Sequence, residues 1–164
     1  MIKLYIALFA CLTLTLACKK SNNEPDSGFK CKLNGKKWRP YNDDFKSREA
    51  EIHLQNNGQE IFILATNSRS LEAIGVGIYT PGKRILPGKY TLDGKTGPRG
   101  FYDNNATHES FYTQSGYEGV LEILKIDTVK LRISGTFYFK AYDETTKLSV
   151  DVTKGEFNLA YVTY

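Results

Sequence analysis

The stretch VKLRISGTFYFKA, at positions 129–141, decides the fold class because its residues alternate strictly in polarity. The odd positions carry Val, Leu, Ile, Gly, Phe, Phe and Ala, whereas the even positions carry Lys, Arg, Ser, Thr, Tyr and Lys. A period of two residues is that of a β-strand with one face on a core and the other toward water. We therefore expect a half-buried strand over 129–141.

Strand and turn patterns continue on both sides of this stretch. Residues 148–152 and 157–161 alternate in the same way around Lys154-Gly155, which predicts a C-terminal hairpin. Nearer the N-terminus, Asn34-Gly35 predicts a tight turn between strands at 29–33 and 36–41. Asn and Gly tolerate the positive φ angles that such turns need. Asn56-Asn57-Gly58 predicts another turn of this kind.

The middle of the chain contains too many helix breakers for a long helix. Prolines and glycines recur throughout residues 81–100, and no segment shows helical periodicity. About nine or ten short strands with tight turns predict an all-β domain. We expect an antiparallel β-sandwich, with a partly open β-barrel as the alternative.

The N-terminus has the layout of a signal peptide. An uncharged apolar run at 4–17 follows Lys3 and ends abruptly at Lys19-Lys20. This run is shorter than the roughly 20 apolar residues that a membrane-spanning helix needs. Ala17-Cys18 resembles the cleavage site of bacterial lipoproteins, so we expect residues 1–17 to be removed and Cys18 to carry the lipid.

Two alternatives to lipidation at Cys18 are open. Cys11 also follows a suitable triplet, but cleavage before it would leave an apolar stub on the mature protein. A plain secreted protein could instead join Cys18 to Cys31 by a disulfide. If Cys18 is acylated, Cys31 has no partner and is expected to be buried in a strand as a small hydrophobe.

The expected organisation is a lipidated flexible tether at 18–27 followed by a single β domain at 28–164. The chain has a formal net charge of +4, and its Lys and Arg residues are scattered among acids. Nucleic-acid binding would require clustered positive charge and a recognisable module, so we expect no nucleic-acid partner.

Three motifs after the cleavage site together resemble a family of small Bacteroidetes-type lipoproteins of unknown function. They are Asn34-Gly35-Lys36-Lys37-Trp38, Leu86-Pro87-Gly88-Lys89-Tyr90 and Ile133-Ser134-Gly135-Thr136-Phe137-Tyr138-Phe139. The resemblance implies a compact β domain lipid-anchored at the outer membrane, and it implies no reaction. Surface-exported members carry acidic residues directly after the cysteine, where this chain has Lys19-Lys20, so whether the protein faces the periplasm or the cell surface stays open.

No catalytic, metal or cofactor motif is complete. Gly94-Lys95-Thr96 lacks the first glycine of a phosphate-binding loop, and His53 and His108 lack the spacing of a zinc site. The acid pairs Asp43-Asp44 and Asp143-Glu144 could serve a glycosidase, but adjacent acids in loops are typical of solvated turns. We expect a protein that is not an enzyme and has no cofactor, and a hydrolase is the weakest of three hypotheses.

Aromatic residues supply the candidate ligand-binding site. Trp38, Tyr41, Phe101 and Tyr102 lie in or near predicted loops, where aromatic rings can form stacking platforms. The competing interpretation is that these rings fill the core between strands. The first functional hypothesis is a non-enzymatic accessory protein that binds a partner protein or envelope component, and the second is a glycan-binding module that uses these aromatic residues.

Overall fold

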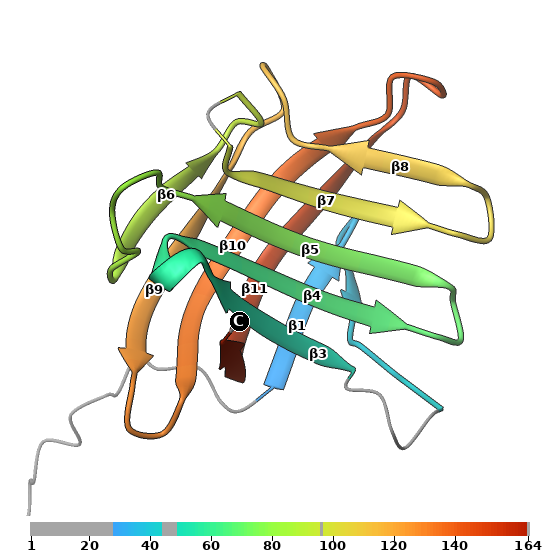
Figure 1. Ribbon diagram of the computed structural model, residues 1–164. Coiled ribbons are helices and arrows are strands. Elements are labelled where there is room, and N and C mark those ends of the chain that lie inside the picture. Colours follow the sequence, from blue (N-terminus) through green and yellow to red (C-terminus); the bar gives the residue numbers. More distant parts are fainter. Residues whose placement is uncertain (1–27, 44–48, 96, 164) are drawn as a thin grey trace, which may run out of the picture.

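The computed structural model describes residues 28–43, 49–95 and 97–163, and these residues form an all-β structure (Figure 1). The eleven strands are β1 (Gly28–Leu33), β2 (Lys36–Trp38), β3 (Ala50–Gln55), β4 (Glu60–Asn67), β5 (Glu72–Tyr79), β6 (Gly88–Leu92), β7 (Arg99–Asn104), β8 (Glu109–Tyr112), β9 (Gly119–Asp127), β10 (Arg132–Tyr142) and β11 (Ser149–Thr163). A short 3-10 turn, η1 (Asn56–Gly58), joins β3 to β4. The predicted all-β class is confirmed, with slightly more strands than expected.

The strands form one sheet that folds over on itself. Its order is β2-β1-β11-β3-β4-β5-β7-β8-β10-β9-β6, and an additional pairing joins β11 to β10. Strands β3, β4, β5, β7 and β8 make the front layer in Figure 1, and β1, β11, β10 and β9 cross steeply behind it. This arrangement is consistent with both expected architectures, the sandwich and the partly open barrel. One join departs from the antiparallel expectation, because β11 and β3 pair in parallel.

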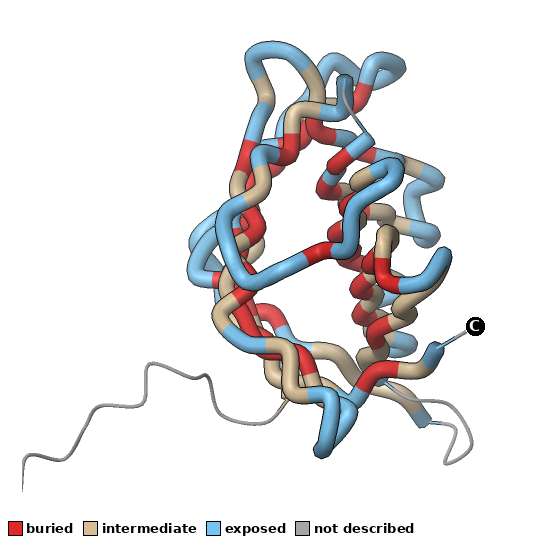
Figure 2. Tube along the Cα trace, turned by 60° about the vertical axis from the view of Figure 1, so that its left-hand side comes forward, coloured by how far each residue is buried: buried red, intermediate tan, exposed pale blue. Residues whose placement is uncertain are grey.

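The hydrophobic core lies between the two layers, where the buried positions of both face each other (Figure 2). Its largest fully buried side chains include Phe139, Phe157 and Ile61. Cys31 is buried in β1, as expected, with 5% of its surface exposed. Burial, and secondarily the charge of Glu72, raises the pKa of the Cys31 thiol to about 12. The thiol is therefore neutral and weakly nucleophilic at physiological pH.

The strand predicted at 129–141 begins three residues later than expected, at Arg132. The Asp127 side chain accepts hydrogen bonds from the backbone N–H groups of Val129 (3.1 Å) and Lys130 (2.8 Å), which closes a turn. Leu131 takes a φ of 51°, and Val129 is 92% exposed. The first residues of the alternating stretch therefore form a turn and not a strand. An Asp side chain stabilises such a turn by accepting hydrogen bonds from backbone N–H groups two and three residues later.

The predicted C-terminal hairpin around Lys154-Gly155 is wrong. Residues 149–163 form the single strand β11, with β1 along one edge and β10 along the other. Lys154 has a φ of 51°, and the register of both neighbouring strands shifts at this point, so the residue pair forms a β-bulge. Strands on both edges keep β11 extended through a sequence that resembles a turn.

The two predicted Asn-Gly turns are confirmed. Asn34 and Gly35 have φ angles of 48° and 81° and join β1 to β2. Asn56, Asn57 and Gly58 also have positive φ angles and lie between β3 and β4. Strand β2 is shorter than the expected 36–41, because it ends before Pro40, which has no N–H to donate to the sheet.

The expected signal peptide at 1–17, the lipid-bearing Cys18 and the tether at 18–27 lie outside the described residues. Within the part of the chain that the structure describes, no helix is long and apolar enough to cross a membrane.

Candidate ligand-binding groove

Two of the four candidate aromatic residues lie in the core. Trp38 and Tyr102 are only 6% and 5% exposed. Both donate hydrogen bonds to the carboxylate of Glu72, from Trp38 Nε1 at 2.7 Å and from the Tyr102 hydroxyl at 2.8 Å. Ser70 Oγ donates a third bond to the same carboxylate at 2.6 Å. These four residues, here called the Glu72 cluster, connect β2, β5 and β7 at one end of the core.

A third candidate, Tyr41, lies apart from the other three. It is half-buried beyond the end of β2 and forms an isolated bridge with Asn67. The guanidinium carbon of Arg69 lies 3.6 Å from the centre of the Tyr41 ring, and this group also donates a hydrogen bond to the Tyr41 hydroxyl. Arg69 thus covers one face of the ring.

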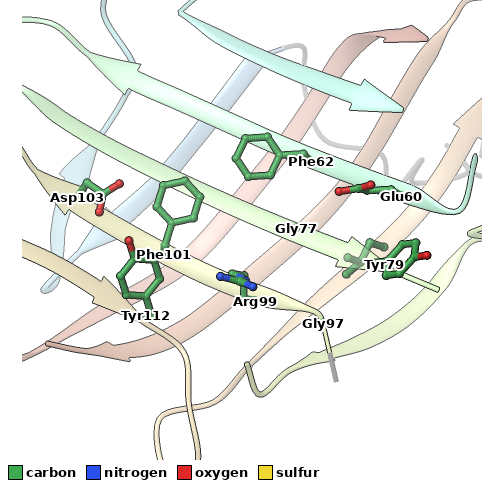
Figure 3. Close-up of a pocket in the computed structure, with 10 residues that line it drawn as sticks. Glu60, Phe62, Gly77, Tyr79, Gly97, Arg99, Phe101, Asp103 and Tyr112 are labelled. Atoms are coloured by element: carbon green, nitrogen blue, oxygen red, sulfur yellow. The ribbon is translucent and has the colours of Figure 1, made fainter. Parts of the chain in front are cut away.

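The fourth candidate, Phe101, lies in a groove on the outer face of the front layer. The groove has a volume of about 510 Å³ and crosses β4, β5, β7 and β8. Its aromatic side chains are Phe62, Tyr79, Phe101 and Tyr112, and its charged side chains are Glu60, Arg99 and Asp103 (Figure 3). These seven residues are here called the groove residues.

Two glycines of β5 lie beneath the groove, and one of them, Gly77, lines it. Gly75 and Gly77 occupy outward positions, between the buried residues Ile74, Val76 and Ile78. A Cβ atom on Gly75 would lie 2.1 Å from the Phe101 ring, so this ring occupies the space that a side chain would fill. The missing side chains therefore allow neighbouring rings to lie across β5.

The aromatic rings of the groove lie flat along the sheet. Phe62 and Phe101 have nearly parallel planes, with an interplanar angle of 11° and centroids 5.9 Å apart. Phe101 and Tyr112 are 6.4 Å apart with an angle of 32°. Figure 3, which looks onto the broad side of the strands, shows the three rings almost face-on. The groove therefore presents ring faces to solvent rather than ring edges.

Carboxylates lie at the two ends of the groove, and a guanidinium lies between them. Glu60 lies at the Tyr79 end, Asp103 lies at the other end, and Arg99 lies between them (Figure 3). Glu60 accepts a hydrogen bond from the Asn56 amide at 2.7 Å. Asp103 Oδ1 is buried and has no hydrogen-bond partner among the described residues. A buried acceptor without a donor is unfavourable, so this oxygen carries a local cost in stability.

A sequence profile places the chain in a family. The family, described as a domain of unknown function (DUF6252), matches residues 27–159. The chain belongs to this family. The match covers every groove residue and most of β11. No curated protein and no solved structure shows a significant match to the chain.

Two aromatic residues of this DUF6252 groove were not among the predicted site residues. Phe62 lies in the uninterrupted apolar run Ile61-Phe62-Ile63-Leu64, which does not indicate an open face, and Tyr112 has no local motif around it. The sequence signal that could have found the groove is Ile74-Gly75-Val76-Gly77-Ile78, in which two successive outward positions of a strand are glycine. Glycines at such positions indicate that a ligand or a side chain from a neighbouring strand lies close to the backbone.

One of the acids considered for catalysis, Asp143, closes a turn in this DUF6252 domain. Asp143 accepts hydrogen bonds from the backbone N–H groups of Thr145 (2.7 Å) and Thr146 (3.3 Å). These bonds, the Thr145 bond foremost, hold the pKa of Asp143 below its usual range. Asp44 lies outside the described residues. His53 pairs with Glu51 at 3.0 Å, and within the described ranges no group of three or more His, Cys, Asp or Glu side chains could hold a metal ion.

Proposed function

We propose that this DUF6252 protein is a lipid-anchored, non-enzymatic binding protein of the cell envelope, and that its groove binds carbohydrate. The observation that carries the proposal is the flat, solvent-facing row formed by Phe62, Phe101 and Tyr112 over the glycines of β5. The signal-like run at 4–17 and the Ala17-Cys18 site support the envelope location.

The chemistry of the groove fits a sugar better than a purely apolar ligand. A sugar ring presents C–H groups on its face, and these pack against the negative face of an aromatic ring. Its hydroxyls point outward from the ring edge, where Glu60 and Asp103 can accept hydrogen bonds and Arg99 can donate them.

Binding without hydrolysis is favoured by where the acids lie. A glycosidase needs two carboxyl groups about 5 to 9.5 Å apart across the bond that is cleaved. Glu60 and Asp103 lie at opposite ends of the groove, with Arg99 and the aromatic rings between them (Figure 3). The groove therefore offers two separate anchoring points for hydroxyls.

Replacing Phe101 by Ala is expected to weaken carbohydrate binding at least about tenfold, because a central aromatic contact is removed. The mature protein in detergent micelles would be screened against a panel of soluble α- and β-linked polysaccharides, and the retained glycan titrated by calorimetry. Tyr138→Ala is the matched control, since Tyr138 is 55% exposed on β10, outside the groove. Equal affinity of the Phe101→Ala variant would refute the groove as the site. Absence of binding across the whole panel, with a partner protein recovered by crosslinking, would support the accessory hypothesis instead.

The membrane anchor is tested by Cys18→Ser. This variant is expected to move from the membrane pellet to the soluble fraction and to lose incorporation of labelled palmitate, because the thiol that would carry the lipid is replaced by a hydroxyl. Two or more acyl chains hold a protein stably in a bilayer. Cys11→Ser is the control and should remain lipidated. A Cys18→Ser protein that still carries palmitate would contradict the assigned anchor.

A further inference from the structure

The aromatic surface does not end at Tyr112. Tyr112 is the direct strand partner of Phe101 on β7 and of Tyr142 on β10. Side chains of directly opposed residues in antiparallel strands lie on the same face of the sheet. The Tyr142 ring in turn stacks on Tyr117, with centroids 4.6 Å apart and an interplanar angle of 22°. Aromatic rings thus follow one another across the outer face from β4 to β10.

A second hollow begins where the groove ends. It has a volume of about 470 Å³ and shares Tyr112 with the groove as a lining residue. Tyr142, Glu109 and Glu144 also line it. Because Tyr112 is 42% exposed and borders both spaces, a ligand lying on its ring can enter both hollows. We propose that the ligand is an extended, neutral polysaccharide chain that runs from the groove past Tyr112 to Tyr142; this inference rests on the proposed carbohydrate function.

The charges along this path favour a neutral chain. Glu60 and Asp103 lie in the groove, and Glu109, Asp143 and Glu144 line the second hollow. Among the described residues, Arg99 is the cation that lines the groove, and Lys147 pairs with Glu144 at 3.3 Å beside the second hollow. The carboxylates outnumber these cations, so a polymer of uronic acids would meet a net repulsion between like charges. Hydroxyl groups, by contrast, can donate to carboxylates.

The backbone of the front layer argues against an extended peptide as the occupant. Strands β4, β5 and β7 are hydrogen-bonded to a neighbour along both edges, so their N–H and C=O groups have partners. A peptide that binds as an added strand needs an open edge for its own amides. If a peptide lay on the outer face, its backbone amides could form hydrogen bonds only with a few side chains of the groove.

The flatness of the ring row selects the kind of polysaccharide. The planes of Phe62 and Phe101 are nearly parallel, and both rings lie on the outer face of the sheet. A β-1,4-linked chain with equatorial linkages is a flat ribbon that can place successive sugar rings on such a row, whereas α-1,4-linked chains coil away from it. The expected ligand class is therefore neutral β-1,4-linked glucan, xylan or mannan.

The test uses dimers and hexamers of β-1,4-linked glucose, xylose and mannose, titrated into the mature protein in detergent micelles. Hexamers of α-1,4-linked and β-1,3-linked glucose and hexagalacturonate are titrated in the same way for comparison. At least one hexamer is expected to bind about tenfold more tightly than its dimer, because it reaches the second hollow. Tyr142→Ala, with Tyr117→Leu as a second variant, should remove this gain while leaving the dimer's affinity unchanged. Phe101→Ala should weaken both lengths. Thermal unfolding of each variant verifies that it is folded.

Each other outcome has a distinct meaning. Equal affinity for dimer and hexamer, or a length gain that survives both Tyr142→Ala and Tyr117→Leu, would overturn the extended site and leave the groove in place. Binding of only α-linked or β-1,3-linked glycans would overturn the proposal that the ligand is a flat β-1,4-linked chain. Tighter binding of hexagalacturonate than of the neutral hexamers would overturn the proposal that the ligand is uncharged. Absence of binding to every glycan would overturn the proposed function itself.

Discussion

A Gly135→Ala variant is expected to lose at least about 3 kcal/mol of unfolding free energy, the upper part of the range for overpacked cores. Gly135 is buried in β10, and a Cβ atom there would lie 2.2 Å from the backbone oxygen of Glu122 on β9. It would also lie 2.6 Å from the ring of Phe157, which is fully buried. A backbone atom held in a paired strand cannot move aside as a flexible side chain can, so β9 and β10 would have to separate locally.

The matched control for this substitution is Gly77→Ala. Gly77 also lies in a strand, but the nearest atom to an added Cβ there is 3.4 Å away, on the Phe62 ring. Its φ is not in the left-handed region, so alanine is compatible and should leave stability unchanged or raise it by up to about 1 kcal/mol. Urea unfolding followed by circular dichroism measures both variants. Similar midpoints for Gly135→Ala and the parent protein would contradict the packing described for β9 and β10.

Local chemistry explains which parts of the fold could be predicted from the sequence. The Asn34-Gly35 turn was predictable because its positive φ angles depend on those two residues alone. The bulge at Lys154-Gly155 was not, because a Lys-Gly pair becomes a bulge only when β1 and β10 hold β11 on both edges. The parallel join of β11 to β3 also depends on pairing between distant segments that no local pattern specifies.

The candidate site was predicted only in part for a related reason. Phe101 and Tyr102 are adjacent in β7, so one side chain must point outward and the other inward. Both residues are aromatic, and the sequence does not show which face of β7 packs against the core. The structure places Tyr102 in the core and Phe101 in the groove. Phe62 and Tyr112 join Phe101 only through the order β4-β5-β7-β8, which skips β6. That order depends on distant contacts rather than on composition.

Replacing Glu72 by Ala is expected to cost about 2 to 4 kcal/mol of unfolding free energy. The change leaves Trp38 Nε1 and the Tyr102 hydroxyl without their acceptor in a mostly buried position, and each unsatisfied donor costs about 1 to 3 kcal/mol. Trp38 is the only tryptophan of the chain, so its fluorescence emission reports directly on the Glu72 cluster. Burial foremost, and then the Glu72 carboxylate, raises the pKa of Tyr102 well above its usual range, and this pKa should fall in the variant.

The control for Glu72→Ala is Glu156→Ala, which also removes one carboxylate. Comparing the two variants shows how much unfolding free energy is lost because of the particular position of Glu72. Glu156 pairs with Lys30 at 2.9 Å, but both side chains are about 40% exposed, and such pairs contribute only about 0 to 1 kcal/mol. A double-mutant cycle with Tyr102→Phe then isolates the hydrogen bond. If Glu72 acts through this bond, Tyr102→Phe costs less in the Glu72→Ala background than in the parent, because no orphaned hydroxyl remains to be buried. Strict additivity of the two changes would show that Glu72 stabilises the end of the core by some route other than the Tyr102 hydroxyl.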